Sequence, residues 1–121
     1  MFHLPDNIAH FLQNKPKNAI DLLTHFYECY SSLGPQEVEV TKTTLAFGTK
    51  KRYCYVYQFG KTFISCSLKL NELYDDPAIF FKCGQLSNDS YVHHFRLYDK
   101  EDITPELKRY MKMALEKSQA D

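Results

Sequence analysis

A stretch of basic residues without intervening carboxylates is the most specific chemical feature of the sequence. No Asp or Glu occurs between Glu39 and Glu72. The basic residues in this window are Lys42, Lys50, Lys51, Arg52, Lys61 and Lys69. Lysine and arginine contact phosphates, and an aromatic ring such as that of Phe63 gives a base a face to stack on. These residues are therefore candidates for anion or nucleic-acid binding, although strand lysines can also serve only to keep a sheet edge solvated.

The histidines and cysteines lack the spacing of a metal site. His93 and His94 are adjacent on an expected strand, where successive side chains point to opposite faces, so the two cannot easily share one ion. No two of the four cysteines form a C-x-x-C pair. Cys54 and Cys66 are expected on opposite faces of a sheet, as small apolar residues in a reducing compartment. The sequence therefore predicts no metal and no cofactor.

Motifs of known enzyme classes are absent from the sequence. There is no G-x-S-x-G elbow, no P-loop and no dinucleotide-binding fingerprint. A cysteine nucleophile would need a nearby histidine, and Cys54 could lie beside His94 only if their strands are neighbours. We therefore expect a binding domain rather than an enzyme, and we assign no catalytic residue.

Two aromatic and β-branched arms around Gly60-Lys61 predict a central β-hairpin from Arg52 to Leu70. The second arm alternates apolar and polar residues with the period of a half-buried strand. A two-residue turn would place a tyrosine face towards the core and a polar face, basic at one end, towards solvent. Its pairs are Phe59–Thr62, Tyr57–Ile64, Tyr55–Cys66 and Tyr53–Leu68 on the core face, and Arg52–Lys69, Cys54–Ser67, Val56–Ser65 and Gln58–Phe63 on the other.

The rest of the chain predicts helices on both sides of this hairpin in sequence. Apolar spacing indicates helices over residues 6–14 and 17–33, and Thr104 followed by Pro105 is typical of a helix start. Further strands are expected at 37–41, around 43–47 and at 91–98, whereas residues 71–90 are irregular. This order predicts an α+β domain in which an antiparallel meander of about five strands has N-terminal and C-terminal helices on one face.

Length and composition fit one domain over residues 1–121. The chain has 15 basic and 15 acidic residues, so its overall charge gives no reason to expect nucleic acid or membrane. No apolar run approaches the ~20 residues of a membrane span. The first residues lack the regions of a signal peptide. A cytoplasmic protein without membrane contact is the expectation.

Several phrases resemble a small bacterial family, numbered 5655 among domains of unknown function. They are Lys42-Thr43-Thr44-Leu45-Ala46-Phe47, Ser67-Leu68-Lys69-Leu70 with the later Asp76-Pro77, His93-His94-Phe95-Arg96-Leu97 and Lys100-Glu101-Asp102-Ile103. The resemblance covers roughly residues 16–117. Members of that family occur alone or attached to putative nucleases, which implies a nucleic-acid-associated accessory role. No catalytic residues are carried over from the family.

Three functions follow as hypotheses. The first is nucleic-acid binding through the basic sheet face. The second is a protein–protein or homodimer module that uses the same face, with Phe63, Val56 and Tyr98 as its apolar patch, or the edge strand at 37–41. The third is a small-ligand pocket near residues 71–90.

Overall fold

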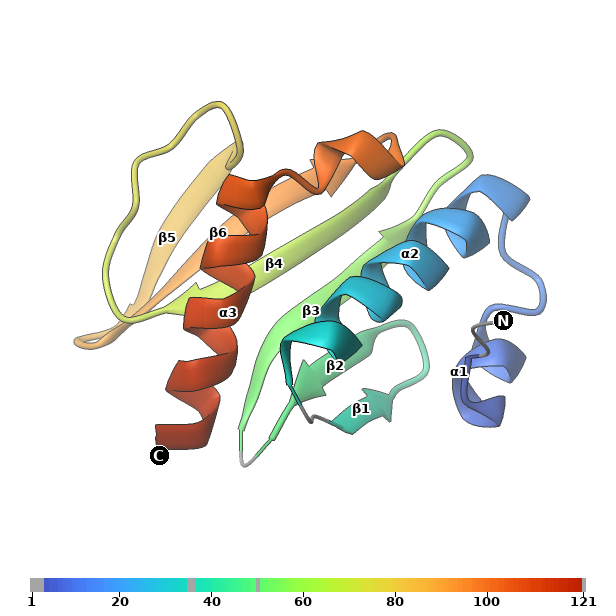
Figure 1. Cartoon of the computed structure of the whole chain (residues 1–121), viewed down its shortest axis with the longest axis horizontal. Coiled ribbons are helices and arrows are strands. Elements are labelled where there is room, and N and C mark those ends of the chain that lie inside the picture. The colour runs from blue at the N-terminus through green and yellow to red at the C-terminus, as the bar shows by residue number, and fades with distance from the viewer. Residues whose placement is uncertain (1–3, 35–36, 50, 121) are drawn as a thin grey trace.

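The computed structural model describes residues 4–34, 37–49 and 51–120, which form one sheet with helices before and after it (Figure 1). The elements are α1 (Asp6–Phe11), α2 (Lys17–Leu33), β1 (Glu37–Val40), β2 (Leu45–Gly48), β3 (Arg52–Phe59), β4 (Ile64–Leu70), β5 (Lys82–Ser87), β6 (Ser90–Leu97), the 3-10 helix η1 (Lys100–Asp102) and α3 (Pro105–Ala120). The predicted α+β class, with an antiparallel sheet and terminal helices, is confirmed.

The sheet has six strands in the order β1-β2-β3-β4-β6-β5, all antiparallel to their neighbours. The prediction of about five strands in a simple meander is therefore wrong at its end, because β6 inserts between β4 and β5. The missed strand is β5, which occupies residues expected to form a loop. Its edge position leaves most of its side chains exposed, so Gly84, Gln85 and Ser87 show no alternation of apolar residues.

The helix boundaries follow local signals. α2 begins directly after Pro16 and ends before Gly34, as predicted. Thr104 caps α3, because its hydroxyl accepts the backbone N–H of Leu107 at 3.2 Å. α1 ends at Phe11 and is shorter than the predicted 6–14. Within the described residues, no helix combines the length and the apolar character needed to cross a bilayer.

The register of the β3–β4 hairpin differs from the predicted one. A four-residue loop, 60–63, replaces the two-residue turn, and the Gly60 N–H donates to the Phe63 carbonyl at 2.8 Å. Tyr55 lies opposite Ser67, and the ladder shifts at a bulge between Val56 and Gln58. Tyr55 and Tyr57 are therefore turned away from the core, where their hydroxyls keep polar partners. Tyr53 stays in the core, as predicted, and packs on Tyr30.

The altered register also changes where the thiols lie. Cys54 and Cys66 are both fully buried on the core face, so the expectation that they point to opposite faces is wrong. Val56 is fully buried beside them and cannot belong to an exposed patch. Because His94 lies on the other face, Cys54 is not positioned to form a nucleophile pair with it.

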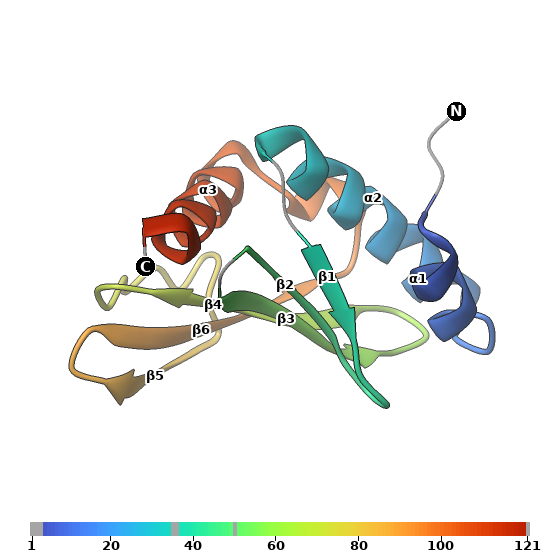
Figure 2. The same ribbon diagram turned by 90° about the horizontal axis from the view of Figure 1, so that it is seen from below.

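Both long helices cover the same side of the sheet, and no described element covers the other side (Figure 2). The core between them contains Phe26 and Tyr30 of α2 and Met111 of α3, packed on Phe47 and Phe95 of the sheet. We call the uncovered side the open face. In β2–β4 and β6, the side chains on one face of the sheet pack against the helices. The side chains on the opposite face of these strands form the open face.

His93 anchors the irregular segment between β4 and β5 to the core. Its ring is fully buried, its Nε2 accepts the backbone N–H of Tyr74 at 3.0 Å, and its Nδ1 lies 3.2 Å from the Tyr91 carbonyl. Nδ1 therefore carries the proton, and the ring is neutral. Burial lowers the pKa of His93 below its ordinary value. A second proton would remove the acceptor that holds Tyr74.

Thiol labelling tests the hairpin register. We expect the native protein to react with a thiol reagent at Cys29 and Cys83, which are half-buried, and to protect Cys54 and Cys66. Burial also raises the pKa of both protected thiols and further slows their reaction. In a Cys29→Ser/Cys83→Ser variant, only Cys54 and Cys66 remain, and they should react with the reagent only when the protein unfolds. Rapid labelling of Cys54 in that folded variant would contradict the observed register.

A second prediction concerns pH. The unfolded chain protonates His93 near its ordinary pKa of about 6.5, whereas the folded protein resists protonation. The free energy of unfolding should therefore fall as the pH drops below about 6.5, because the unfolded state then binds more protons. The free energy of unfolding, measured with urea at several pH values across this range, should depend less steeply on pH for His93→Gln than for the wild type. If the free energy of unfolding depended on pH as steeply in His93→Gln as in the wild type, this role of His93 would be contradicted.

Candidate functional site

The open face carries positive charge without carboxylates over most of its width. Strands β2 to β6 contain no Asp or Glu, and the only acidic strand residues are Glu37 and Glu39 in β1. The Lys and Arg residues of the same five strands are Arg52, Lys69, Lys82 and Arg96. A chain with balanced total charge therefore has a basic surface on the open side of β3–β6.

A row of rings crosses the open face from the β3–β4 loop towards β5. The Arg96 guanidinium lies 5.0 Å from the ring centre of Phe63 and 4.5 Å from that of Phe81. The Phe63 ring also contacts Tyr98 at 5.3 Å between ring centres. On the other side of Arg96, the Phe81 ring lies 6.0 Å from that of His94. We call Tyr57, Phe63, Phe81, His94, Arg96 and Tyr98 the aromatic strip.

Much of the aromatic strip is accessible to solvent. The exposed fractions are 39% for Tyr57, 49% for Phe81 and 54% for Tyr98. Arg96 is also exposed, so its charge is held between rings but still faces water. Aromatic rings of this size are usually buried, and a group of them on one face is a feature of binding surfaces.

Small residues in β4 allow the strip to form. Ser65 and Ser67 are the open-face residues between β3 and β6, and their exposed fractions are only 1% and 5%. They leave room for Tyr57 to reach across β4, where its hydroxyl lies 3.1 Å from Nδ1 of His94. Ser65 also donates to the Gln58 side chain at 2.8 Å. The long side chains of the outer strands therefore close over the serines.

His94 is held in its neutral form by its surroundings. Partial burial is the largest cause that lowers its pKa, and the charge of Lys82 on the neighbouring strand lowers the pKa further. The neutral ring offers one nitrogen acceptor and one N–H donor, in addition to an aromatic face.

The sequence-predicted site residues are separated into two groups. Lys42 and Lys61 are exposed in the β1–β2 and β3–β4 loops at one end of the sheet, whereas Lys51, Arg52 and Lys69 lie at the opposite end. Lys50 lies outside the described residues. Phe63 belongs to the aromatic strip. The candidates therefore do not form one continuous patch.

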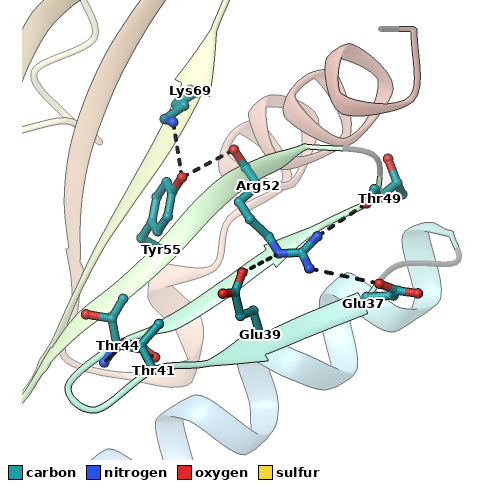
Figure 3. Close-up of polar contacts among 8 residues, drawn as sticks. All are labelled: Glu37, Glu39, Thr41, Thr44, Thr49, Arg52, Tyr55 and Lys69. Atoms are coloured by element: carbon teal, nitrogen blue, oxygen red, sulfur yellow. Dashed lines mark hydrogen bonds and ion pairs between the residues drawn. The ribbon is translucent and has the colours of Figure 1, made fainter.

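Arg52 does not face Lys69 across a strand pair, which corrects the predicted like-charge contact. Its partner in the ladder is Gly48, and its Nε lies 3.2 Å from Oε1 of Glu39, with Glu37 at 4.0 Å (Figure 3). Its Nη1 donates to the Thr49 carbonyl at 3.2 Å. The carboxylates of β1 therefore offset part of the Arg52 charge. The carboxylate-free window of the sequence did not reveal this contact, because the carboxylates of β1 lie outside the window.

Lys69 has no carboxylate within ion-pair distance among the described residues. Its Nζ donates to the Tyr55 hydroxyl at 3.1 Å and lies 5.0 Å from the centre of that ring. The Tyr55 hydroxyl in turn donates to the Arg52 carbonyl at 3.4 Å. Figure 3 shows how Tyr55 connects Lys69 with Arg52. The ammonium is oriented by neutral groups and retains its charge for a ligand.

Lys51, Arg52 and Lys69 meet at a cavity of about 410 Å³. The cavity opens where β3 and β4 diverge, and Lys117 and Ser118 of α3 complete its wall. The remaining lining residues are Tyr53, Tyr55, Ser87, Asp89 and Ser90. We call this the basic cavity.

A second cavity, of about 360 Å³, lies beside the irregular segment at the other end of β6. It is lined by residues 77–79, by Phe81, by residues 95–98 and by Asp102, Thr104 and Leu107. Among the described residues, no group of three or more His, Cys, Asp or Glu side chains is placed to hold a metal ion.

Sequence reasoning missed most of the aromatic strip. His94, Arg96 and Tyr98 alternate along the last strand and its end, so their common face was readable from the sequence. Phe81 was not, because it follows a turn and reaches the open face through a strand that the sequence did not predict. Lys117 reaches the basic cavity only through the packing of α3.

The comparison with family models assigns the chain to a family whose function is unknown. A family model described as Domain of unknown function (DUF5655) matches residues 8–118, so the chain belongs to this family, as its sequence phrases indicated. Comparison with curated proteins and with solved structures gives no match.

The pKa of His94 provides a test of the open-face geometry. We expect Lys82→Ala to raise this pKa, because it removes a positive charge that opposes protonation. NMR titration of the imidazole signals would measure the change. Lys61→Ala, in the exposed β3–β4 loop, serves as the control and should leave the value unchanged. A pKa of His94 that does not respond to Lys82→Ala would contradict the arrangement of β5 and β6.

Proposed function

We propose that this domain binds single-stranded nucleic acid on its open face. The observation that carries the proposal is the aromatic strip, in which exposed rings flank Arg96 on a sheet whose strands β2–β6 contain no carboxylate. Single strands are bound by rings that stack on the bases and by cations that contact the phosphates.

The geometry favours single strands over duplexes. Phe81 and Tyr98 present ring surface to solvent, which only unstacked bases can use, because the bases of a duplex are already stacked. Lys82 and Arg96 stand beside these rings and are available for phosphates. The absence of a helix or loop projecting from the described open face also argues against reading a groove by insertion (Figure 2).

The proposal moves the site from the location first predicted. The sequence pointed to β1–β4, but Glu37 and Glu39 offset Arg52 at that side of the sheet. The carboxylate-free part of the sheet lies over β3–β6. Phe63 is the only residue of the original candidate set that belongs to the strip.

A protein interface on the same face is the second candidate function. The exposed rings of Tyr57, Phe81 and Tyr98 support it, because apolar rings also anchor protein partners or a second copy of the chain. Salt separates the two: phosphate contacts weaken steeply with salt, whereas apolar association does not. The small-ligand alternative has the cavity beside residues 77–79 in its favour.

Fluorescence anisotropy with labelled oligonucleotides tests the proposal. We expect single strands to bind more tightly than duplexes, and binding to weaken between about 50 and about 200 mM salt. Phe81→Ala should cost about 1–3 kcal/mol through the loss of stacking. Arg96→Glu should weaken binding further, because it also places a carboxylate on the path of the phosphates.

Arg109→Glu is the matched control, because Arg109 lies exposed on α3, away from the open face. It should retain wild-type affinity. If no oligonucleotide binds at low salt, or if Arg109→Glu weakens binding as much as Arg96→Glu, the open face is not a nucleic-acid site. Sedimentation of the wild type and of Phe81→Ala would then test the protein-interface alternative.

A further inference from the structure

The basic cavity is produced by a split in the sheet. Cys54 and Leu68 form the last β3–β4 pair at this end. Beyond this pair, Arg52 bonds to β2, whereas Lys69 and Leu70 pair with β6. Figure 1 shows the two strands diverging below α3. The strands therefore leave room between them, and α3 and the β5–β6 turn form the remaining walls.

The lining of the cavity is strongly biased towards cations and hydroxyls. Among the described residues, four basic side chains from three elements and one turn line it, against one carboxylate, that of Asp89. Asp89 accepts a hydrogen bond from the Ser87 hydroxyl at 3.1 Å. Hydroxyls are also contributed by Tyr53, Tyr55, Ser90 and Ser118. A lining of this kind is polar and positively charged, which suits an oxyanion better than an apolar ligand.

The four cations are not equivalent. Arg52 is paired with Glu39, so it contributes less charge to the cavity. Lys69 is oriented by Tyr55, and Lys117 extends from the last turn of α3. No described carboxylate lies within ion-pair distance of Lys69 or Lys117. These two ammonium groups therefore contribute positive potential that no described carboxylate offsets.

We propose that the basic cavity binds a phosphate monoester. A dianionic phosphate has enough charge and acceptor oxygens to engage Lys69, Lys117 and several hydroxyls at once. The volume of about 410 Å³ lies within the size range of small-ligand pockets and exceeds what a bare phosphate fills. The group attached to the phosphate is therefore accommodated inside the cavity. The same chemistry is present in a phosphorylated small molecule and at the phosphorylated end of a nucleic acid.

This site is independent of the aromatic strip. None of the strip residues lines the basic cavity, so the phosphate proposal does not rest on single-strand binding. Arg96→Glu should remove binding at the strip and leave the cavity intact. Failure of one proposal can therefore be told from failure of the other.

NMR titration of backbone amides with three probes tests the proposal. We expect inorganic phosphate and adenosine 5′-monophosphate to shift the signals of Lys51, Arg52, Lys69 and Lys117 with saturation, whereas adenosine does not. Lys117→Glu should weaken adenosine 5′-monophosphate binding by roughly ten-fold or more. Lys112→Glu, exposed on the same helix and outside the cavity, should not weaken it. Asp89→Asn should tighten it, because it removes the only lining carboxylate.

The comparison of probes in the wild type does not depend on how any variant folds. Absence of saturable shifts with phosphate and with adenosine 5′-monophosphate would overturn the proposal. Equal shifts with adenosine, or equal weakening by Lys112→Glu and Lys117→Glu, would overturn it as well.

Oligonucleotides with and without a 5′-phosphate identify the source of the phosphate. A preference for the 5′-phosphorylated strand that Lys117→Glu abolishes would assign the cavity to nucleic-acid ends. Saturable binding of adenosine 5′-monophosphate, without such a preference, would assign it to a phosphorylated small molecule.

Discussion

The structure depends on a constraint at β4, which must pack on both of its faces. Towards the helices it presents Ile64, Cys66 and Leu68, all fully buried. Towards the open face it presents Ser65 and Ser67, which are themselves almost buried, and Lys69 at its end. A serine side chain is small, and its hydroxyl can form a hydrogen bond to a neighbouring residue, as Ser65 does with Gln58. Longer side chains from β3 and β6 can therefore meet above the serines. The residues on the two faces of β4 therefore contribute to the hydrophobic core on one side and allow the aromatic strip to form on the other.

The same sheet separates charge within a chain that has no net charge. The acidic residues lie in helices, loops and β1, whereas β2–β6 carry only cations. Arg96 lies between two rings and Lys69 beside Tyr55, so each cation is held by an aromatic neighbour. Such contacts orient a charge without neutralising it. Arg52 differs, because Glu39 and Glu37 pair with it, and these contacts reduce the positive potential next to β1.

The sequence was sufficient for the elements with strong local signals. Three local signals correctly predicted a sheet with helices on one face. They are the apolar stripe of α2, the helix cap at Thr104 and the apolar–polar alternation of β4. The hairpin register was not predictable, because the bulge at Tyr57 adds a residue that strict alternation does not allow. The Arg52–Glu39 pair joins separate strands, and the basic cavity needs α3 in place. The periodicity of apolar residues predicts each helix or strand separately, whereas these features depend on contacts between elements.

Chemical-shift mapping with a single-stranded oligonucleotide tests the central claim most directly. If the open face is the working surface, the largest backbone shifts will fall on β3, β4 and β6 around Tyr57, His94 and Arg96. The buried faces of α2 and α3 will remain unchanged, and the shifts will diminish with added salt. Shifts confined to the helices, or spread evenly over the lysines of the surface, would contradict the account.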